Sequence, residues 1–520
     1  MRVVELAIDK FKNLTNFSID FDAEALTTVV LGRNGTGKSN LLEALIIIFQ
    51  GLDLGAAPAF KYRMTYLCRD TEVTIDADPE RSGREQVRIK VDGEPLSYQQ
   101  FSKQTGRRYL PSYVFGYYSG PSNRMETHFD AHQKRFYDEL LKGEDRPLRP
   151  LLYARLVHSQ FALLSFFNEQ DPGILHFLTE HLGIERLDSV LFVMRKPSWT
   201  SKAGDPRFWN ARGVVKDFLD RLYELALVPL RLPRRVHLDF KQSTNLEHLY
   251  LYLKDVDDLK ALAAMYNSQQ EFFKALESTY ISEILSEVRI RLQIRNADGT
   301  LTFRDLSEGE QQLLMVLGLL RFTKEDEALF LLDEPDTHLN PAWGIQYLEF
   351  IRLVVGELPK SQILMATHNP LVISSLERLE VRIMRRDDES GQVYSVIPEE
   401  SPRGMGIAGI LTSDLFGLRS TLDIPTQRLV DERRELAAQD DITSQQRARL
   451  RDLNQQLEGL DFSITTLPDP LYHDFVNAMT RHEDPAIRDS VTLTPEQRAS
   501  QKALTQQILQ ELKQEERQQE

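Results

Sequence analysis

The pattern of apolar and polar residues predicts a sheet at the start of the chain and a buried helix directly after it. Short runs rich in apolar and β-branched residues at 3–8, 17–21 and 28–31 indicate three strands separated by turns. Residues 41–49 are then apolar on nearly every face of a helix. We therefore expect this helix to be buried against the sheet.

The same two patterns alternate along the rest of the chain. Residues 73–96 predict a β-hairpin layer, and residues 113–118 predict a further strand. Helical periodicity dominates at 126–285, and strand character returns at 288–294. Four parts are expected: an N-terminal lobe at 1–125, a mostly helical insertion at 126–285, a C-terminal lobe at 286–400, and a helical region for partners or oligomerisation at 401–520.

The last of these parts contains an apolar seam in a charged, glutamine-rich stretch. Leu450, Leu453, Leu457 and Leu460 repeat at spacings of three and four residues, as one face of a helix requires. The seam is too short for an autonomous coiled coil. Two alternatives remain open: the seam packs on the body of its own chain, or it binds a partner.

Composition narrows the classes of function. The chain has 520 residues and a formal net charge of −15, so any nucleic-acid contact must be local. Its one cysteine, Cys68, excludes an intrachain disulfide framework. No apolar run reaches the roughly 18 residues that span a bilayer, so we expect a soluble cytoplasmic protein without membrane contact. Two basic clusters could contact phosphates: one is Lys103, Arg107 and Arg108, and the other is Arg231, Arg234 and Arg235. The ordinary interpretation of both is charge on a solvated surface.

Residues 32–39 have the sequence GRNGTGKS, a complete G-x-x-x-x-G-K-[ST] phosphate loop between an apolar strand and an apolar helix. The glycines let backbone N–H groups curl around phosphate oxygens, and the helix N-terminus adds a partial positive charge. Lys38 is placed to reach the β- and γ-phosphates, and the Ser39 hydroxyl is placed to bind Mg²⁺. The predicted ATP contacts are Gly32, Arg33, Asn34, Gly35, Thr36, Gly37, Lys38, Ser39 and Asn40.

Two acids follow a buried strand at 328–332, where the carboxyl ends of strands bind ligands in open α/β sheets. Asp333 would hold Mg²⁺, and Glu334 would position or deprotonate the water that attacks the γ-phosphate. The next strand ends at His368, which could contact the γ-phosphate. The predicted catalytic residues are thus Lys38, Glu334 and His368. The alternatives are that the two acids merely cap a turn and that the histidine is structural.

A fourth motif, LSEGEQQ at 306–312, stands directly before an apolar helix. Ser307 and Gly309 lie at the predicted helix start, where free N–H groups and a hydroxyl can bind a γ-phosphate. In isolation the same residues could form an ordinary N-cap.

Taken in order, GRNGTGKS, LSEGEQQ, LLDEP and the THN histidine are similar to the motifs of ATP-binding cassette (ABC) ATPases. The opening FKNL and the asparagine of GRNGTGKSN resemble the branch that contains the SMC, RecF and OLD-type ATPases. The resemblance implies an α/β fold: an ABC-type head with a mixed sheet and a phosphate-loop helix, joined here to a helical insertion and a helical C-terminal region. It also implies ATP and Mg²⁺ as cofactors. In that family, head-to-tail dimers or larger assemblies place the signature of one subunit at the ATP of another, which assigns an action in trans to Ser307, Glu308, Gly309 and Glu310.

The chain departs from the family at one position. The family has a glutamine after a strand of the first lobe, where it contacts Mg²⁺ and the attacking water. Residues 117–124 resemble that region and contain no glutamine. Gln133 is the nearest candidate, so the role stays unassigned. Residues 336–341 match the D-loop region of the family, in which His338 is expected to be structural.

The short insertion and the helical tail resemble the PtuA ATPase subunits of Septu and retron-associated antiphage systems. No nuclease constellation is visible in the sequence, and PtuA ATPases work with a separate HNH-type nuclease, PtuB. The resemblance therefore implies an ATP-hydrolysing defence subunit that controls a PtuB-like nuclease, with a retron reverse transcriptase and its DNA as further partners. The alternatives are a RecF-like repair ATPase that clamps DNA and, with less support, the ATP-binding subunit of a membrane transporter.

Overall fold

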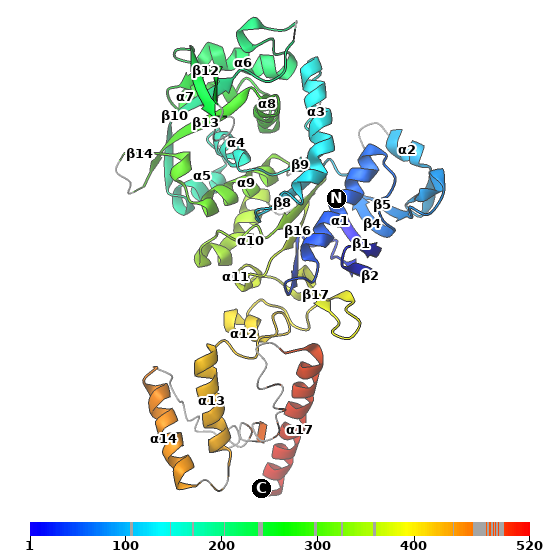
Figure 1. Cartoon of the computed structure of the whole chain (residues 1–520), viewed down its shortest axis with the longest axis vertical. Helices are drawn as coiled ribbons and strands as arrows, with labels where there is room; N and C mark the ends of the chain where they lie inside the picture. The colour runs from blue at the N-terminus through cyan, green and yellow to red at the C-terminus, as the bar shows by residue number, and fades with distance from the viewer. Residues whose placement is uncertain are drawn as a thin grey trace. The chain divides into compact units, whose positions relative to one another are not determined.

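The computed structural model describes most of the chain as two compact units, Met1–Ile397 and Pro398–Glu520. The first unit contains all the named strands together with helices, whereas the named elements of the second unit are helices (Figure 1). Arg107, one of the candidate phosphate contacts, lies outside the described residues. Those residues are 1–103, 108–145, 147–168, 171–201, 203–237, 243–295, 299–323, 326–356, 360–439, 441, 443–460, 475, 478, 479, 482, 484, 487 and 493–519.

A seven-stranded sheet forms the centre of the first unit. Its strand order is β18-β17-β3-β16-β15-β8-β9, and all neighbours are parallel except β17 and β18. Every side chain of β15 and β16 is buried, as expected for central strands of a parallel sheet. The strands are β3 (Thr27–Gly32), β8 (Tyr113–Tyr118), β9 (Leu151–Tyr153), β15 (Ala328–Asp333), β16 (Gln362–Ala366), β17 (Val381–Arg386) and β18 (Val393–Val396).

Helix α1 (Lys38–Leu54) lies in one hydrophobic core with this sheet and with a six-stranded antiparallel sheet. Contacts on both sides explain why the sequence of α1 is apolar on nearly every face. The predicted β-hairpin layer is part of the antiparallel sheet, whose order is β2-β1-β4-β5-β6-β7. Its strands are β1 (Arg2–Phe11), β2 (Leu14–Asp20), β4 (Tyr62–Cys68), β5 (Thr71–Ala77), β6 (Val87–Val91) and β7 (Glu94–Leu96).

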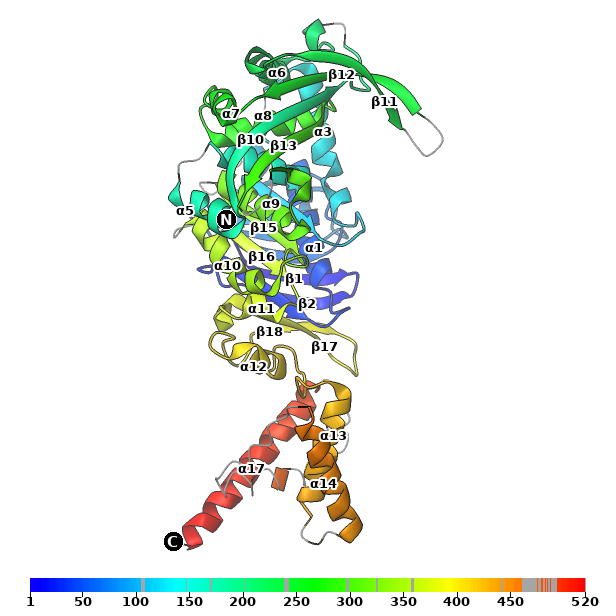
Figure 2. The ribbon, with the colours of Figure 1, turned by 90° about the vertical axis from the view of Figure 1, so that its left-hand side faces the viewer.

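The prediction of a mostly helical insertion missed a five-stranded antiparallel sheet of order β11-β12-β10-β13-β14. Local patterns failed here because β10 and β12 are rich in leucine and carry charged residues, a composition that also suits helices. Because β10 pairs with β13, the predicted boundary between residues 285 and 286 would divide one sheet. Figure 2 shows β11 and β12 projecting as a long hairpin. The strands are β10 (Ile184–Arg195), β11 (Leu230–His237), β12 (Ser243–Leu253), β13 (Leu285–Ile294) and β14 (Thr300–Thr302).

Helix α4 (Val157–Phe166) of the insertion packs closely on α9 (Glu308–Phe322), the helix that follows the LSEGEQQ motif. A Cβ atom on Gly318 would lie 2.2 Å from the Cβ of Ala162. The two backbones can therefore approach only because residue 318 is glycine. This contact joins the insertion to the signature helix.

The second unit contains α12 (Gly406–Thr412), α13 (Ile424–Ala437), α14 (Ser444–Glu458) and α17 (Pro495–Gln519). The apolar seam lies on and just after α14, which packs on α13. Leu453 and Leu457 are fully buried, whereas Leu460 is 56% exposed. Packing within the unit thus uses the middle of the seam and leaves its end in solvent. None of the described helices has the length and apolar character to cross a membrane.

Gly318→Ala should lower the free energy of unfolding by about 1–3 kcal/mol, because the added methyl group overpacks the contact between α4 and α9. Gly51→Ala in α1 is the matched control. A Cβ atom on Gly51 would have no neighbouring atom of another segment within 4 Å, so helix propensity should stabilise this variant by up to about 1 kcal/mol. Urea unfolding of both variants measures the difference, and equal stabilisation of the two would contradict the close contact.

Candidate nucleotide-binding site

The GRNGTGKS segment forms a tight loop between β3 and α1. Gly35 and Gly37 have φ angles of +84° and +96°, which favour glycine. The Thr36 hydroxyl donates to the carbonyl of Arg33 at 2.8 Å. No side chain caps the first turn of α1, so its N-terminal N–H groups are available to an anion.

Lys38 is the buried cation of this loop. Its side chain folds back, so that Nζ donates to the carbonyl oxygen of Gly32 at 2.8 Å. Burial lowers the pKa of Lys38, and the nearby carboxyl groups of Glu334 and Asp333 oppose that shift. The structure therefore brings the predicted phosphate-binding lysine to the two acids that follow β15.

Asp333 ends β15 with a side chain that is almost fully buried. Neither of its carboxylate oxygens has a hydrogen-bond partner among the described residues. Burial raises the pKa of Asp333 to about 6, and the nearby Ser39 hydroxyl opposes the shift. A buried carboxylate without a partner is costly, and with Ser39 it offers the oxygen ligands that Mg²⁺ prefers. The two residues thus fit the predicted metal site, although the described residues include no cluster of three or more His, Cys, Asp or Glu that could hold a metal alone.

Glu334 and His368 form a pair at the same edge of the sheet. His368 Nδ1 lies 2.7 Å from Oε2 of Glu334. The backbone of Glu334 has a φ of +54°, a strained value for a residue with a side chain, and its N–H donates to the carbonyl of Ala366 at 2.8 Å. The strain turns the chain at the end of β15 and places the carboxylate beside the histidine that follows β16.

The LSEGEQQ motif begins α9 as a capping box. The Ser307 hydroxyl accepts from the N–H of Glu310, and the Glu310 carboxylate accepts from the N–H of Ser307 at 2.6 Å. Among these described residues, no hydrogen bond or ion pair joins positions 307–310 to Lys38 or Ser39. The ordinary N-cap is therefore present. Ser307 and Glu308 are exposed, and they make no such bond to these two residues of the phosphate loop of their own chain.

The signature is anchored to the loop that follows Glu334. His338 Nδ1 lies 3.2 Å from Oε2 of Glu308. A Cβ atom on Gly309 would lie 2.5 Å from the carbonyl oxygen of His338, so only glycine fits there without a backbone shift. The structural role expected for His338 agrees with these contacts.

Sequence reasoning missed a polar network on the outer side of the phosphate loop. Glu43 of α1 accepts hydrogen bonds from Lys12 at 2.6 Å, from Arg124 at 2.9 Å and from His128 at 2.9 Å. Burial opposes ionisation, but these bonds outweigh it and lower the pKa of Glu43 to about 2. The signal was present in the sequence, since a glutamate within the apolar run 41–49 must have partners when it is buried.

The same network reaches the loop through two asparagines. Arg124 donates to Oδ1 of Asn40 at 2.6 Å, and Asn40 donates to Oδ1 of Asn13 at 2.6 Å. Asn13 in turn donates to the carbonyl of Gly35 at 2.9 Å. Arg124 also contributes to the charge environment of Asp333. Four segments of the first lobe are thus held around the phosphate loop.

Gln133 does not take the place of the glutamine that is missing after β8. The Gln133 side chain accepts a hydrogen bond from Arg155 at 2.8 Å. The residue that does follow β8 at the acid pair is Ser119, whose N–H donates to the carbonyl of Asp333 and whose hydroxyl lies 3.0 Å from that of Thr337. The glutamine role therefore stays unassigned.

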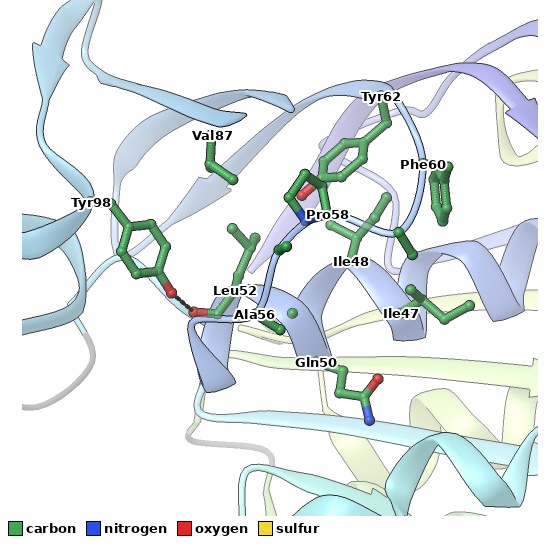
Figure 3. Close-up of a pocket in the computed structure, with 13 residues that line it drawn as sticks. Ile47, Ile48, Gln50, Leu52, Ala56, Pro58, Phe60, Tyr62, Val87 and Tyr98 are labelled. Carbon is green, nitrogen blue, oxygen red and sulfur yellow. Dashed lines mark hydrogen bonds between the residues drawn. The ribbon is translucent and has the colours of Figure 1, made fainter. Parts of the chain in front are cut away.

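A cavity of about 120 Å³ lies at the opposite end of α1 (Figure 3). Its lining includes Ile48, Leu52, Pro58, Tyr62 and Tyr98 and contains no charged side chain. A triphosphate needs cations and free N–H groups, which this cavity does not offer. The candidate nucleotide site is instead the open surface at the N-terminal end of α1.

Two family models match separate parts of the chain. The model of an AAA ATPase domain matches residues 1–94, and the model described as an AAA domain, putative AbiEii toxin, Type IV TA system, matches residues 180–374. The first match includes the phosphate loop, and the second includes the signature, the acid pair and His368. The Septu protein PtuA of Bacillus mycoides is 27% identical over 214 residues, which cover 39% of this chain and 30% of that protein. The chain therefore matches ATPase domains in both segments that hold these motifs, and it is similar in sequence to PtuA over part of its length.

Other relatives align over different shares of the chain. The DNA replication and repair protein RecF of Chlorobaculum parvum is 29% identical over 42% of this chain and 61% of that protein. The retron Vc95 probable ATPase of Vibrio cholerae is 20% identical over 82% of this chain and 80% of that protein. The chain thus spans less than two thirds of the PtuA and RecF relatives named here. The SMC head domain from Thermotoga maritima superposes with a TM-score of 0.32 at 14% identity, covering 77% of this chain and 100% of that domain.

The sequence relatives confirm the resemblance to PtuA and RecF ATPases, and the structure confirms the α/β fold class with a helical C-terminal region. The roles assigned to individual residues stay predictions.

Glu43→Gln should destabilise the protein at pH 7 by about 1–2 kcal/mol, after allowance for solvent screening of its partly exposed partners. The pKa of Glu43 is lowered in the folded state, so its contribution is present above the ordinary glutamate pKa. It should fade as the pH falls toward about 2. Urea unfolding between pH 7 and pH 3.5 measures this trend.

Glu72→Gln is the matched control, because Glu72 is exposed on β5. It should change the unfolding free energy by less than about 0.5 kcal/mol. A loss for Glu43→Gln that does not depend on pH would contradict an ionised, hydrogen-bonded Glu43.

Proposed function

We propose that the chain binds ATP with Mg²⁺ at the phosphate loop and hydrolyses it slowly in a site that a second copy completes. The observation that carries this proposal is the buried, unpartnered carboxylate of Asp333 next to Ser39 and Lys38. A metal bound to phosphate would give that carboxylate the positive partner that it lacks. The matches to ATPase family models support the same assignment.

The residues divide the chemistry among them. Lys38 would leave the Gly32 carbonyl and donate to phosphate oxygens, and the loop N–H groups would hold the remaining charge. Glu334 would take the proton of the attacking water, and His368, 2.7 Å from its carboxylate, would hold it in position. Bound Mg²⁺ supplies neutralisation of the charge on the phosphates. Ser39 and Asp333 are the residues that would hold it.

A composite site accounts for the position of the signature. Ser307 and Glu308 are exposed, and they make no hydrogen bond or ion pair to Lys38 or Ser39 of their own chain. The start of α9, where Ser307 and Glu310 form a capping box, would instead meet the γ-phosphate on a second copy, with contacts from Ser307, Gly309 and their neighbours. Slow hydrolysis follows, because the isolated chain lacks half of the site.

The comparisons support a role in antiphage defence. The retron ATPase aligns over 82% of this chain, and the Septu relative matches with 27% identity. The proposed role is an ATPase that senses infection and controls a separate effector, an HNH-type nuclease like PtuB, with a retron reverse transcriptase and its DNA as further partners. The RecF relative supports the alternative of a DNA-clamping repair ATPase, but its alignment covers only 42% of this chain.

Mixing Ser307→Arg with Lys38→Ala should restore part of the ATP hydrolysis that each variant alone has lost. Only a mixed pair joins an intact loop, from the Ser307→Arg chain, to an intact signature, from the Lys38→Ala chain. Phosphate release measured over a range of mixing ratios tests this expectation, and light scattering shows whether mixed pairs form.

The control adds Glu334→Gln to one or the other of the two mixed chains. Glu334→Gln in the Ser307→Arg chain removes the base from the only intact site, so recovery should disappear. The same substitution in the Lys38→Ala chain should leave recovery unchanged. No recovery when mixed pairs are shown to form would refute the composite site.

The purified chain should leave plasmid DNA intact with Mg²⁺ or Mn²⁺, since its described residues hold no metal cluster of nuclease type. Deletion of residues 427–520 should spare ATP binding and remove a PtuB-like nuclease from a pull-down. Within that region, Leu460→Ser changes the exposed end of the seam and should weaken the partner, whereas Arg451→Ser on α14 should not. Metal-dependent cleavage by the chain alone would overturn this part of the proposal.

A further inference from the structure

The five-stranded sheet of the insertion has one face covered by helices and one partly exposed face, on which Val193 and His248 are nevertheless buried. Helices α6 (Gly213–Leu225), α7 (Val256–Ala263) and α8 (Gln269–Ile281) contact its strands, and buried side chains such as Phe192, Leu251 and Ile290 form its inner face. Residues paired across antiparallel strands point to the same face. Val193 pairs with Tyr250, and Leu191 pairs with both Tyr252 and Arg289. The two tyrosines and the arginine therefore lie together on the other face.

Positive charge gathers on this partly exposed face. Arg289 and Arg304 lie 2.9 Å and 2.6 Å from carboxylate oxygens of Glu287, and Arg234 lies 3.9 Å from it. For Arg291 and Arg186, both described and exposed, the structure records no ion pair. Three arginines thus lie near one glutamate, and two more arginines are exposed on the same sheet, in a chain whose net charge is −15. An excess of this kind on one face indicates a polyanionic partner.

Flat and apolar side chains lie between the arginines. Tyr250 and Tyr252 are half-buried on neighbouring positions of β12. Leu230, which pairs with Tyr250, and Leu232 on β11 are each 47% exposed. The Tyr250 ring stacks on His248 on one side. Partly exposed rings and aliphatic side chains beside arginines suit nucleic-acid bases, which stack on such surfaces while their phosphates meet the cations.

A protein strand fits this face less well. The edge strands of the sheet are β11 and the three-residue β14, and Pro233 in the middle of β11 has no N–H to donate to a further strand. The face also differs from the basic cluster suggested by the sequence. Of that cluster only Arg234 belongs to it, because Arg231 pairs with Glu247 and lies over the Trp209 ring, and Arg235 donates to Ser243.

We propose that this arginine–tyrosine face binds single-stranded nucleic acid, with phosphates at the arginines and unpaired bases stacked on Tyr250 and Tyr252. A duplex would hide the base faces that the rings require. The inference goes beyond the proposed ATP hydrolysis, since the face includes no residue of the nucleotide site. The face is made of Arg186, Arg234, Arg289, Arg291, Arg304, Tyr250, Tyr252, Leu230 and Leu232.

Fluorescence anisotropy of a labelled oligothymidylate of about 20 nucleotides, titrated with the full chain, tests the proposal. The affinity should fall with salt with a log–log slope of about −3, for roughly four phosphate contacts. Arg291→Ala should reduce that slope by about 0.7, and Tyr250→Ala should weaken binding about tenfold with the slope unchanged. Tyr250→Phe keeps the ring and should bind as the wild type does.

Two further variants sharpen the test. Glu287→Gln frees three arginines from a competing carboxylate, so it should tighten binding several-fold. Arg63→Ala removes an exposed arginine from β4 in the other lobe and should have no effect. Lys38→Ala should bind the oligonucleotide normally, so a failure of the ATP assignment and a failure of this one can be told apart.

Three results would overturn the proposal. One is the absence of saturable binding at low salt. Another is equal competition by a duplex of the same length together with unchanged binding by Tyr250→Ala and Tyr252→Ala. The third is a change in oligomeric state, without loss of oligonucleotide binding, in the double variant Leu230→Ser, Leu232→Ser, which would make the face an interface between copies.

Discussion

The candidate site depends on the in-register parallel pairing of β3, β16 and β15. Val30, Ala366 and Asp333 lie side by side across these strands, so the segments that follow leave the sheet at one edge. Those segments carry the phosphate loop, His368 and Glu334. Fully buried side chains on β15 and β16 fix the register, because a slip of one residue would turn every side chain to the opposite face.

Two buried acids near the phosphate loop have pKa values shifted in opposite directions. Glu43 is surrounded by Lys12, Arg124 and His128, and its pKa falls to about 2. The carboxylate oxygens of Asp333 have no hydrogen-bond partner among the described residues, and burial raises the pKa of this carboxyl to about 6. Glu43 thus serves the rigidity of the lobe, since its charge is already neutralised. The carboxylate of Asp333 lacks such partners in the part of the chain that the structure describes, and this difference is the reason that we propose Asp333, and not Glu43, as a ligand of a bound cation.

Much of the fold and site could be predicted because the motifs are local. A strand, a glycine-rich turn and an apolar helix are contiguous in sequence, and the capping box of Ser307 and Glu310 spans one helical turn. The sheet of the insertion could not be predicted, since β10 joins β12 and β13 through pairings between distant segments. The partners of Glu43 come from separate loops for the same reason, so the sequence shows the buried charge and hides what neutralises it.

The contact between Gly309 and His338 has a consequence for how a pair of chains would respond to ATP. The signature of each chain would bind its neighbour's nucleotide, while the loop packed behind that signature leads back to the chain's own Glu334. A shift of the signature by a neighbouring phosphate would therefore move the backbone next to Glu334, the proposed catalytic acid. The two nucleotides of such a pair would therefore bind cooperatively, with a Hill coefficient between one and two.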